Sequence, residues 1–165
     1  MTDWQEDWRA CFDAHGRAML LFARQFTGTI EDAEDAVQDG FIRFWRRRRQ
    51  AEDQNAYLYA CIRTAALDQS RERKRRSQRE QTVARRDEAA WFACPVEQQE
   101  RRRHIEEAIG ELPLEQREVL MLKTWGGLTF DQIAQVCGIS INTASSRYRY
   151  ALGTLRQRLD TEYRP

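Results

Sequence analysis

The sequence is poor in the residues that build metal centres, disulfide frameworks and hydrolytic sites. It has four cysteines and two histidines among 165 residues. Cys11, Cys61, Cys94 and Cys137 lie far apart, without a CxxC or Cys/His ligand spacing, so we interpret them as reduced residues that bind no metal. Neither histidine has a serine, cysteine or carboxylate partner at a recognisable catalytic spacing. These absences disfavour an enzyme.

Long apolar runs and strand patterns are also missing. No apolar run approaches the roughly 18 residues of a membrane span, and the N-terminus, MTDWQEDWR, lacks the apolar region of a signal peptide. We find no alternation of the kind that strands show and no internal repeat. The sequence therefore predicts an all-α protein without membrane insertion, in the cytoplasm.

The net charge of the chain is also low. Charged residues make up 32% of the chain, yet the formal net charge is only +1. Any affinity for nucleic acid must therefore come from how the charges are segregated along the chain. The length allows one domain or two small ones, and 41% hydrophobic residues suffice for modest cores.

The segment from Leu112 to Leu159 predicts a helix followed by a helix-turn-helix. The first helix runs from Pro113 to Thr124, because proline is favoured at a first helical position. Thr129 is a suitable N-cap for a short second helix that stops at Gly138. Ser140 caps a third helix, whose inward positions are Ile141, Ala144, Tyr148, Ala151, Leu152, Leu155 and Leu159.

The opposite face of this third helix has no acidic residue from Ile141 to Leu159. Its first two turns place small hydrogen-bonding side chains beside arginines, which is the chemistry of a recognition helix in the major groove of DNA. The alternative is a three-helix packing module with a solvated polar face. From this motif alone both interpretations stay open.

The first half of the chain carries two apolar stripes at helical spacing. The first, in residues 4 to 26, comprises Trp8, Cys11, Phe12, His15, Met19, Phe22 and Phe26. The second helix, Glu31 to Trp45, has acids in its first half and arginines at its end, as the helix dipole favours. The dipole does not explain Gln38 among the acids. An acidic, amide-bearing face could equally dock a basic partner helix.

A polar loop from Gln50 to Asn55 precedes a third helix, for which Asn55 is the expected cap. Tyr57 and Tyr59 open this helix, and eight basic residues follow between Arg71 and Arg86. Aromatic and basic residues together serve single-stranded nucleic acid, although a solvated helix end gives the same pattern. Periodicity fades from Ser77 to Pro95, where we expect a linker, and Glu97 to Glu111 predicts a further charged helix.

Three stretches in this order resemble the extracytoplasmic-function (ECF) sigma factors of the sigma-70 family. They are DAEDAVQDGFIRFW from Asp32, AYLYACIRTAALD from Ala56, and ELPLEQREVLMLKTWGGLTFDQIAQVCGISINTASSRYRYAL from Glu111. The resemblance implies two small helical domains joined by a flexible linker. Residues 1–76 would be sigma region 2, 77–96 the linker, and 97–165 sigma region 4, with no cofactor and no catalytic residue.

The resemblance also assigns residues to partners. Asp35, Gln38 and Asp39 would dock on the clamp helices of the largest subunit of bacterial core RNA polymerase, and region 4 would meet the flap of the second-largest subunit. The loop from Gln50 and the helix after it would hold the melted minus-10 element of promoter DNA. The residues implied at minus-10 are Asn55, Tyr57, Arg63, Arg71 and Lys74.

The duplex minus-35 element would be read by the third helix of region 4. The residues implied there are Thr143, Ser145, Ser146, Arg147, Arg149 and Tyr150. Family members are often held by an anti-sigma factor, which is therefore a further candidate partner. Tyr57, Thr64 and Ser145 depart from the family's commoner tryptophan, asparagine and lysine or arginine, so we transfer no promoter sequence. The resemblance places Trp91 and Phe92, in the linker, toward the polymerase.

Two other classes remain as alternatives. A stand-alone helix-turn-helix regulator would bind duplex DNA without polymerase and would need a dimer surface to read two half-sites. A helical adapter that binds only protein would show no salt-dependent DNA affinity, whereas phosphate contacts weaken steeply with salt.

Overall fold

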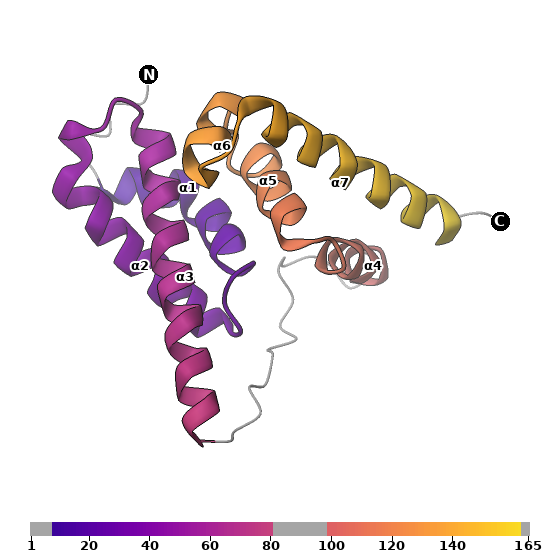
Figure 1. Cartoon of the computed structure of the whole chain (residues 1–165), viewed down its shortest axis with the longest axis horizontal. Helices are drawn as coiled ribbons and strands as arrows, with labels where there is room; N and C mark the ends of the chain where they lie inside the picture. Colours follow the sequence, from indigo (N-terminus) through magenta and orange to yellow (C-terminus); the bar gives the residue numbers. More distant parts are fainter. Residues whose placement is uncertain (1–7, 81–98, 163–165) are drawn as a thin grey trace.

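The computed structural model describes residues 8–80 and 99–162, in which every regular element is a helix (Figure 1). Trp91, Phe92, Cys94 and most of the expected linker lie outside these residues. The elements are α1 (Trp8–Ala23), α2 (Ile30–Arg47), the short 3₁₀ helix η1 (Arg48–Gln50), α3 (Gln54–Glu80), α4 (Gln99–Gly110), α5 (Leu114–Thr124), α6 (Phe130–Cys137) and α7 (Ile141–Glu162).

Helices α1, α2 and α3 pack together as a first unit. Thr29 caps α2, since its side chain accepts a hydrogen bond from the Asp32 amide at 3.1 Å. At the crossing of α2 and α3 the backbones approach closely, because a Cβ built on Gly40 would lie 2.6 Å from Ile62 Cα. The largest buried side chains of this unit include Phe22, Phe44 and Tyr59. Tyr59, one of the two aromatic residues expected at the nucleic-acid surface, is therefore a core residue.

Two other expectations about the first unit were wrong. Asp53, not Asn55, caps α3, because its Oδ1 accepts a hydrogen bond from the Ala56 amide at 2.9 Å. Phe12, a member of the apolar stripe of α1, is 46% exposed. Helix α3 also continues to Glu80, so the first residues of the expected linker are helical.

Helices α4 to α7 form the second unit, and its turns follow the predicted capping. Thr129 and Gln132 form a capping box at the start of α6, and Gly138 ends that helix with a φ of 66°. The Ser140 side chain accepts a hydrogen bond from the Thr143 amide at 3.0 Å, which confirms the predicted cap of α7. Pro113 lies one position before α5 rather than inside it. Ile141 and Leu152, expected inside, are 49% and 43% exposed.

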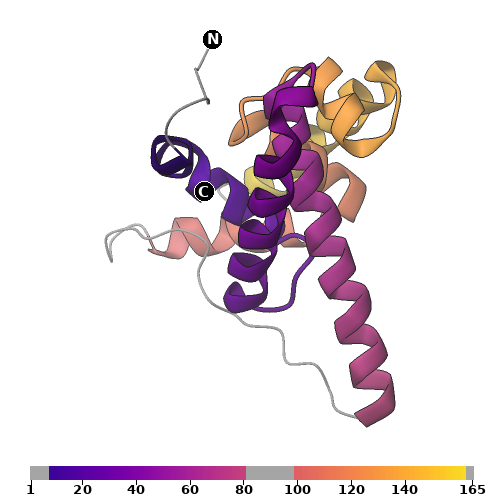
Figure 2. The same ribbon diagram turned by 90° about the vertical axis from the view of Figure 1, so that its left-hand side faces the viewer.

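The two units are in contact. Helix α1 packs against α5 and α3 against α6, and the buried apolar residues of both units form one continuous cluster. Figures 1 and 2 show the C-terminal half of α3 projecting beyond this packed region. The packing leaves that half of α3, with its run of arginines, open to partners.

Candidate nucleic-acid interface

The acidic face of α2 is the side opposite its buried face. Ala33, Ala36, Val37, Gly40 and Phe44 point into the core. Helical periodicity therefore places the three residues predicted to dock on a partner outward: Asp35 and Gln38 are exposed, and Asp39 is half-buried. Ile42 follows on the same face and is 45% exposed. A single exposed apolar side chain is common on protein surfaces, so the accessible acidic and amide groups are what this face offers to a partner.

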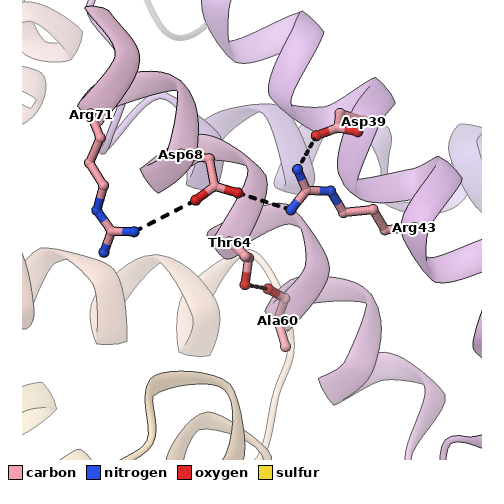
Figure 3. A network of polar contacts seen from close by, with 6 residues as sticks. All are labelled: Asp39, Arg43, Ala60, Thr64, Asp68 and Arg71. Carbon is pink, nitrogen blue, oxygen red and sulfur yellow. Dashed lines mark hydrogen bonds and ion pairs between the residues drawn. The ribbon is translucent and has the colours of Figure 1, made fainter. Parts of the chain in front are cut away.

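A network of ion pairs joins this acidic face to α3 (Figure 3). The Arg43 guanidinium lies 2.7 Å from the Asp39 carboxylate and 3.1 Å from the Asp68 carboxylate, and Arg71 lies 3.6 Å from Asp68. Desolvation disfavours the charge on Arg43, but the bonds to Asp68 and Asp39 outweigh it and raise the pKa of the guanidinium. Arg43 and Asp68 therefore connect Asp39, predicted to bind polymerase, to Arg71, predicted to bind DNA.

A pocket of about 460 Å³ opens between the end of α2 and the start of α3. Three arginines form its basic wall, and Tyr57, predicted to bind minus-10 DNA, lies beside them. The full lining is Arg43, Arg46, Arg47, Tyr57, Ala60, Cys61 and Thr64. Thr64 donates a hydrogen bond to the Ala60 carbonyl at 2.9 Å (Figure 3), so its hydroxyl is turned along the helix. A basic wall with an aromatic side chain suits a nucleotide.

The other predicted minus-10 residues lie in different surroundings. Arg71 lines a groove along the projecting half of α3 together with Asp68, Glu72, Arg75, Arg76 and Arg79, and Lys74 is exposed on the same stretch. Asn55 is half-buried at the start of α3, and the described residues give its buried Oδ1 no hydrogen-bond partner. The structure does not bring all five residues onto one surface.

Arg63 differs from the other predicted minus-10 residues because it contacts the second unit. Its guanidinium is paired with the Glu118 carboxylate on α5, in the second unit. The Glu118 side chain is only 4% exposed and also accepts a hydrogen bond from the Cys137 thiol at 3.1 Å. An Arg63 contact with DNA therefore requires this ion pair to break.

The first turns of α7 present the predicted recognition residues. Ser145, Arg149 and Tyr150 are exposed, whereas Thr143, Ser146 and Arg147 are half-buried. The buried Ala144 and Ala151 hold the opposite side of the helix against the core. The Arg149 guanidinium lies over the Tyr150 ring, 5.8 Å from its centre. A surface of this kind, with hydroxyl groups beside arginines and no carboxylate, fits the edge of duplex DNA.

Sequence reasoning did not find the residues that join the two units. Glu118 and Gln132 were not assigned a role, and Asp53 was placed only within a polar loop. Their partners lie 55 and 79 positions away, a separation at which no periodic pattern connects two side chains.

Neither a metal site nor a membrane-spanning helix is found in the described part of the chain. No group of histidine, cysteine, aspartate or glutamate residues there could hold a metal ion. Within the same residues, no helix is long and apolar enough to cross a membrane.

Two family models match the chain in the order of its two units. The model for sigma-70 region 2 matches residues 11–76, and that for sigma-70 region 4 matches residues 102–155. The ECF RNA polymerase sigma factor SigL of Mycobacterium tuberculosis is 29% identical over 156 residues, which cover 90% of this chain and 86% of SigL. The ECF sigma factor RpoE of Cereibacter sphaeroides is 26% identical and covers 96% of both chains.

Two solved structures share the fold. The sigma factor RpoE of Bartonella quintana, crystallised with the anti-sigma factor NepR, aligns with a TM-score of 0.73 at 24% identity, over 93% of this chain and 97% of that one. CnrH, in complex with the cytosolic domain of CnrY, aligns with a TM-score of 0.63 at 23% identity, over 92% and 86%. Both alignments extend over the two units.

Proposed function

From the premise that this chain belongs to the sigma-70 family and is an ECF RNA polymerase sigma factor that directs transcription initiation, we propose how its surfaces divide that work. Residues 1–76 act as region 2, residues 97–165 as region 4, and residues 77–96 connect them. Two short helical units then present one polymerase-binding surface and two DNA-binding surfaces.

The acidic face of α2 docks on core polymerase. Asp35, Gln38 and Asp39 meet the basic clamp helices of the largest subunit, as complementary charges favour. The exposure of Asp35 and Gln38 supports this assignment, because neither side chain is needed inside the fold. Region 4 meets the flap of the second-largest subunit.

Region 2 holds the melted minus-10 strand. An extruded base lies near Asn55 and Tyr57, and the phosphates follow the basic groove past Arg71 and Lys74, with Arg63 joining once it is released from Glu118. Unstacking a base costs a few kcal/mol, so a pocket that holds the flipped base favours melted over paired DNA. The basic pocket beside Tyr57 supports this role.

Region 4 anchors duplex DNA at minus-35. Ser145, Ser146, Arg149 and Tyr150 face the base edges, and Thr143 and Arg147 the sugar-phosphate backbone. The exposed, acid-free start of α7 supports this role.

The two DNA-binding surfaces act together only on the polymerase. Each binds DNA weakly alone, and core polymerase holds both at the spacing of two promoter elements, which converts two weak sites into one strong one. The polymerase performs all the chemistry, and this chain contributes no catalytic residue. We place the protein in the cytoplasm, where it reaches the polymerase.

An anti-sigma factor is a proposed regulator of this chain. Both solved relatives carry such a partner or a partner's cytosolic domain. We expect a partner of this class to compete with core polymerase for the acidic face of α2.

The ordered pair of region 2 and region 4, each with its exposed charged helix face, is the observation that carries the proposal. The test is transcription by purified bacterial core polymerase, with and without this protein, on a randomised promoter library with sequencing of the transcript starts. Starts that depend on the protein and share two upstream elements support the proposal. Duplex DNA binding without dependent starts would point instead to a stand-alone regulator.

A further inference from the structure

The four consecutive arginines at the end of α2 do not share the same surroundings. Arg46, Arg47 and Arg49 are exposed, whereas Arg48 is half-buried. The guanidinium carbon of Arg48 lies 3.6 Å from the centre of the Trp45 ring. A guanidinium this close to an indole gains a cation–π contact, and its planar group stacks on the ring. Arg48 is therefore held by its own helix, while its three neighbours are open to solvent.

The Trp45 ring is in turn fixed by the first unit. It stacks on Phe41, one turn earlier, with the ring centres 5.9 Å apart and the planes 20° from parallel. Both rings pack against the hydrophobic core. Aromatic pairs favour this offset-stacked arrangement. The Arg48 guanidinium therefore lies against a side chain whose position the core determines.

Arg48 also shapes the connection between α2 and α3. Its guanidinium donates a hydrogen bond to the Trp45 carbonyl in the last turn of α2, where helix carbonyls lack partners within the helix. Its own carbonyl accepts hydrogen bonds from the Ala51 amide at 3.3 Å and from Gln54 Nε2 at 3.4 Å. One residue thus ties the end of α2, the turn after η1 and the start of α3 together.

This connection joins the two walls of the basic pocket. Arg46 and Arg47 line the pocket from α2, and Tyr57 lines it from α3. The Tyr57 ring packs near Phe44, with the ring centres 6.0 Å apart. A displaced connection would change the separation of these walls. A binding site discriminates between similar ligands only when the residues behind it hold its walls in place.

We propose that Trp45 and Arg48 are positioning residues of the minus-10 site. Their contact orders the connection between α2 and α3, and this order lets the pocket distinguish one extruded base from another. Loss of the order weakens a base that fits the pocket more than a strand held only through its phosphates, because the fitting base must then order the connection as it binds. The effect on base choice rests on the proposed function, whereas the order of the connection does not.

Arg48→Ala tests the order of the connection in the full-length chain. The ratio of ordered to open connection should fall at least about fivefold, since a cation–π contact and a charge-assisted hydrogen bond are both lost. Deuterium exchange at the Ala51 amide, measured by NMR, should accelerate by the same factor. Arg49→Ala removes the same charge from the next position, which is exposed, and should leave the exchange rate unchanged.

A double-mutant cycle shows whether the contact with Trp45 carries the effect. Trp45→Leu removes the aromatic ring but keeps an apolar side chain at this half-buried position. In the Trp45→Leu background, Arg48→Ala should accelerate exchange at Ala51 less than it does in the wild type. Circular dichroism checks that the helices of each variant are intact. Equal acceleration in both backgrounds would overturn the role of Trp45.

The randomised promoter library measures the choice of base. Arg48→Ala should flatten the preference at one minus-10 position and leave the minus-35 preference unchanged, whereas Arg49→Ala should keep both. Faster exchange at Ala51 with an unchanged minus-10 preference supports the ordering role and overturns the role in base choice. An unchanged exchange rate in Arg48→Ala overturns the proposal. A wild type without dependent transcript starts overturns the proposed function, and the exchange rates still decide the ordering role.

Discussion

At the scale of single residues, two arginines of α3, Arg63 and Arg71, have different surroundings. Arg63 is paired with a buried carboxylate of the second unit. Arg71 is 67% exposed, and its ion-pair partner among the described residues is Asp68, three positions earlier on its own helix. Exposed pairs of this kind contribute about 0 to 1 kcal/mol, so Arg71 is available to a phosphate at little cost. Arg63 is not.

We expect Arg149→Ala to weaken binding to duplex minus-35 DNA by about 1 to 3 kcal/mol, because one good base contact has that value. Core polymerase affinity should not change. Fluorescence anisotropy with a promoter duplex measures the loss, and Arg156→Ala, which removes the same charge from an exposed position later on α7, is the control. Loss of core binding in Arg149→Ala would contradict the assignment of the two surfaces.

Reversing the charge of Asp35 should reduce affinity for core polymerase at least tenfold, since the substituted lysine would face the basic clamp helices. Asp35→Lys is the direct test, by titration of labelled core polymerase. Asp13→Lys makes the same charge change on an exposed position of α1 and should bind as the wild type does. Equal affinities of the two variants would reduce the acidic face to a solvated surface matched to the helix dipole.

At the scale of helices, Gly40 sets how closely α2 and α3 approach. A Cβ there would lie 2.6 Å from Ile62 Cα and 2.8 Å from Ile62 N, both of which are backbone atoms that cannot rotate away. This crossing places the acidic face of α2 relative to the basic groove of α3.

We predict that Gly40→Ala destabilises the protein by about 1 to 3 kcal/mol, since the helices must separate to admit the methyl group. Gly153→Ala is a matched control in α7, where a Cβ would meet nothing within 4 Å. That change should stabilise by about 0.5 to 1 kcal/mol, because alanine is the better helix former. Urea unfolding followed by circular dichroism measures both changes in unfolding free energy. The same sign for the two changes would contradict the close approach of α2 and α3.

The cap of α6 is a second determinant of stability at the scale of helices. Thr129→Ala removes one bond of the capping box and should cost about 1 kcal/mol of unfolding free energy. Thr129→Ser keeps the hydroxyl and should recover most of it. The same urea titration compares the two, and equal losses would mean that the methyl group of Thr129, not its hydroxyl, stabilises the turn.

At the scale of the whole molecule, the Glu118 carboxylate, which pairs with Arg63 of the first unit, also acts on a thiol of the second. Burial, the Glu118 carboxylate and the hydrogen bond to it raise the pKa of Cys137. A raised pKa leaves little reactive thiolate at neutral pH. The reactivity of this thiol therefore reports on the Glu118 carboxylate.

We expect Cys137 to react slowly with iodoacetamide between pH 7 and 9, and faster in Glu118→Gln, because loss of the Glu118 carboxylate lowers the pKa of the thiol toward its ordinary value. Cys11 is an internal control, because burial alone raises its pKa to about 12, with no contribution from Glu118. Mass spectrometry of the alkylated peptides gives both rates. Equal acceleration of the two thiols would indicate general unfolding.

Local patterns in the sequence determined the elements and most of their ends. Thr129, Gly138 and Ser140 cap their helices as predicted, because a cap depends on residues within three or four positions of each other. The outward direction of Asp35 and Gln38 also follows from one helical period. The roles of these residues in binding polymerase and DNA stay predictions, for which the family supplies the reason and the exposed faces the support.

Only the tertiary structure decided which residues meet across the chain. The burial of Tyr59, the choice of Asp53 over Asn55 as a cap and the pairing of Arg63 with Glu118 all depend on how helices far apart in sequence pack. Exposed Phe12, Ile141 and Leu152 show the same limit, since periodicity finds an apolar stripe but not the width of the surface that covers it. The sequence thus determined two charged helix faces, and the packing of the units decided that one of them is partly covered.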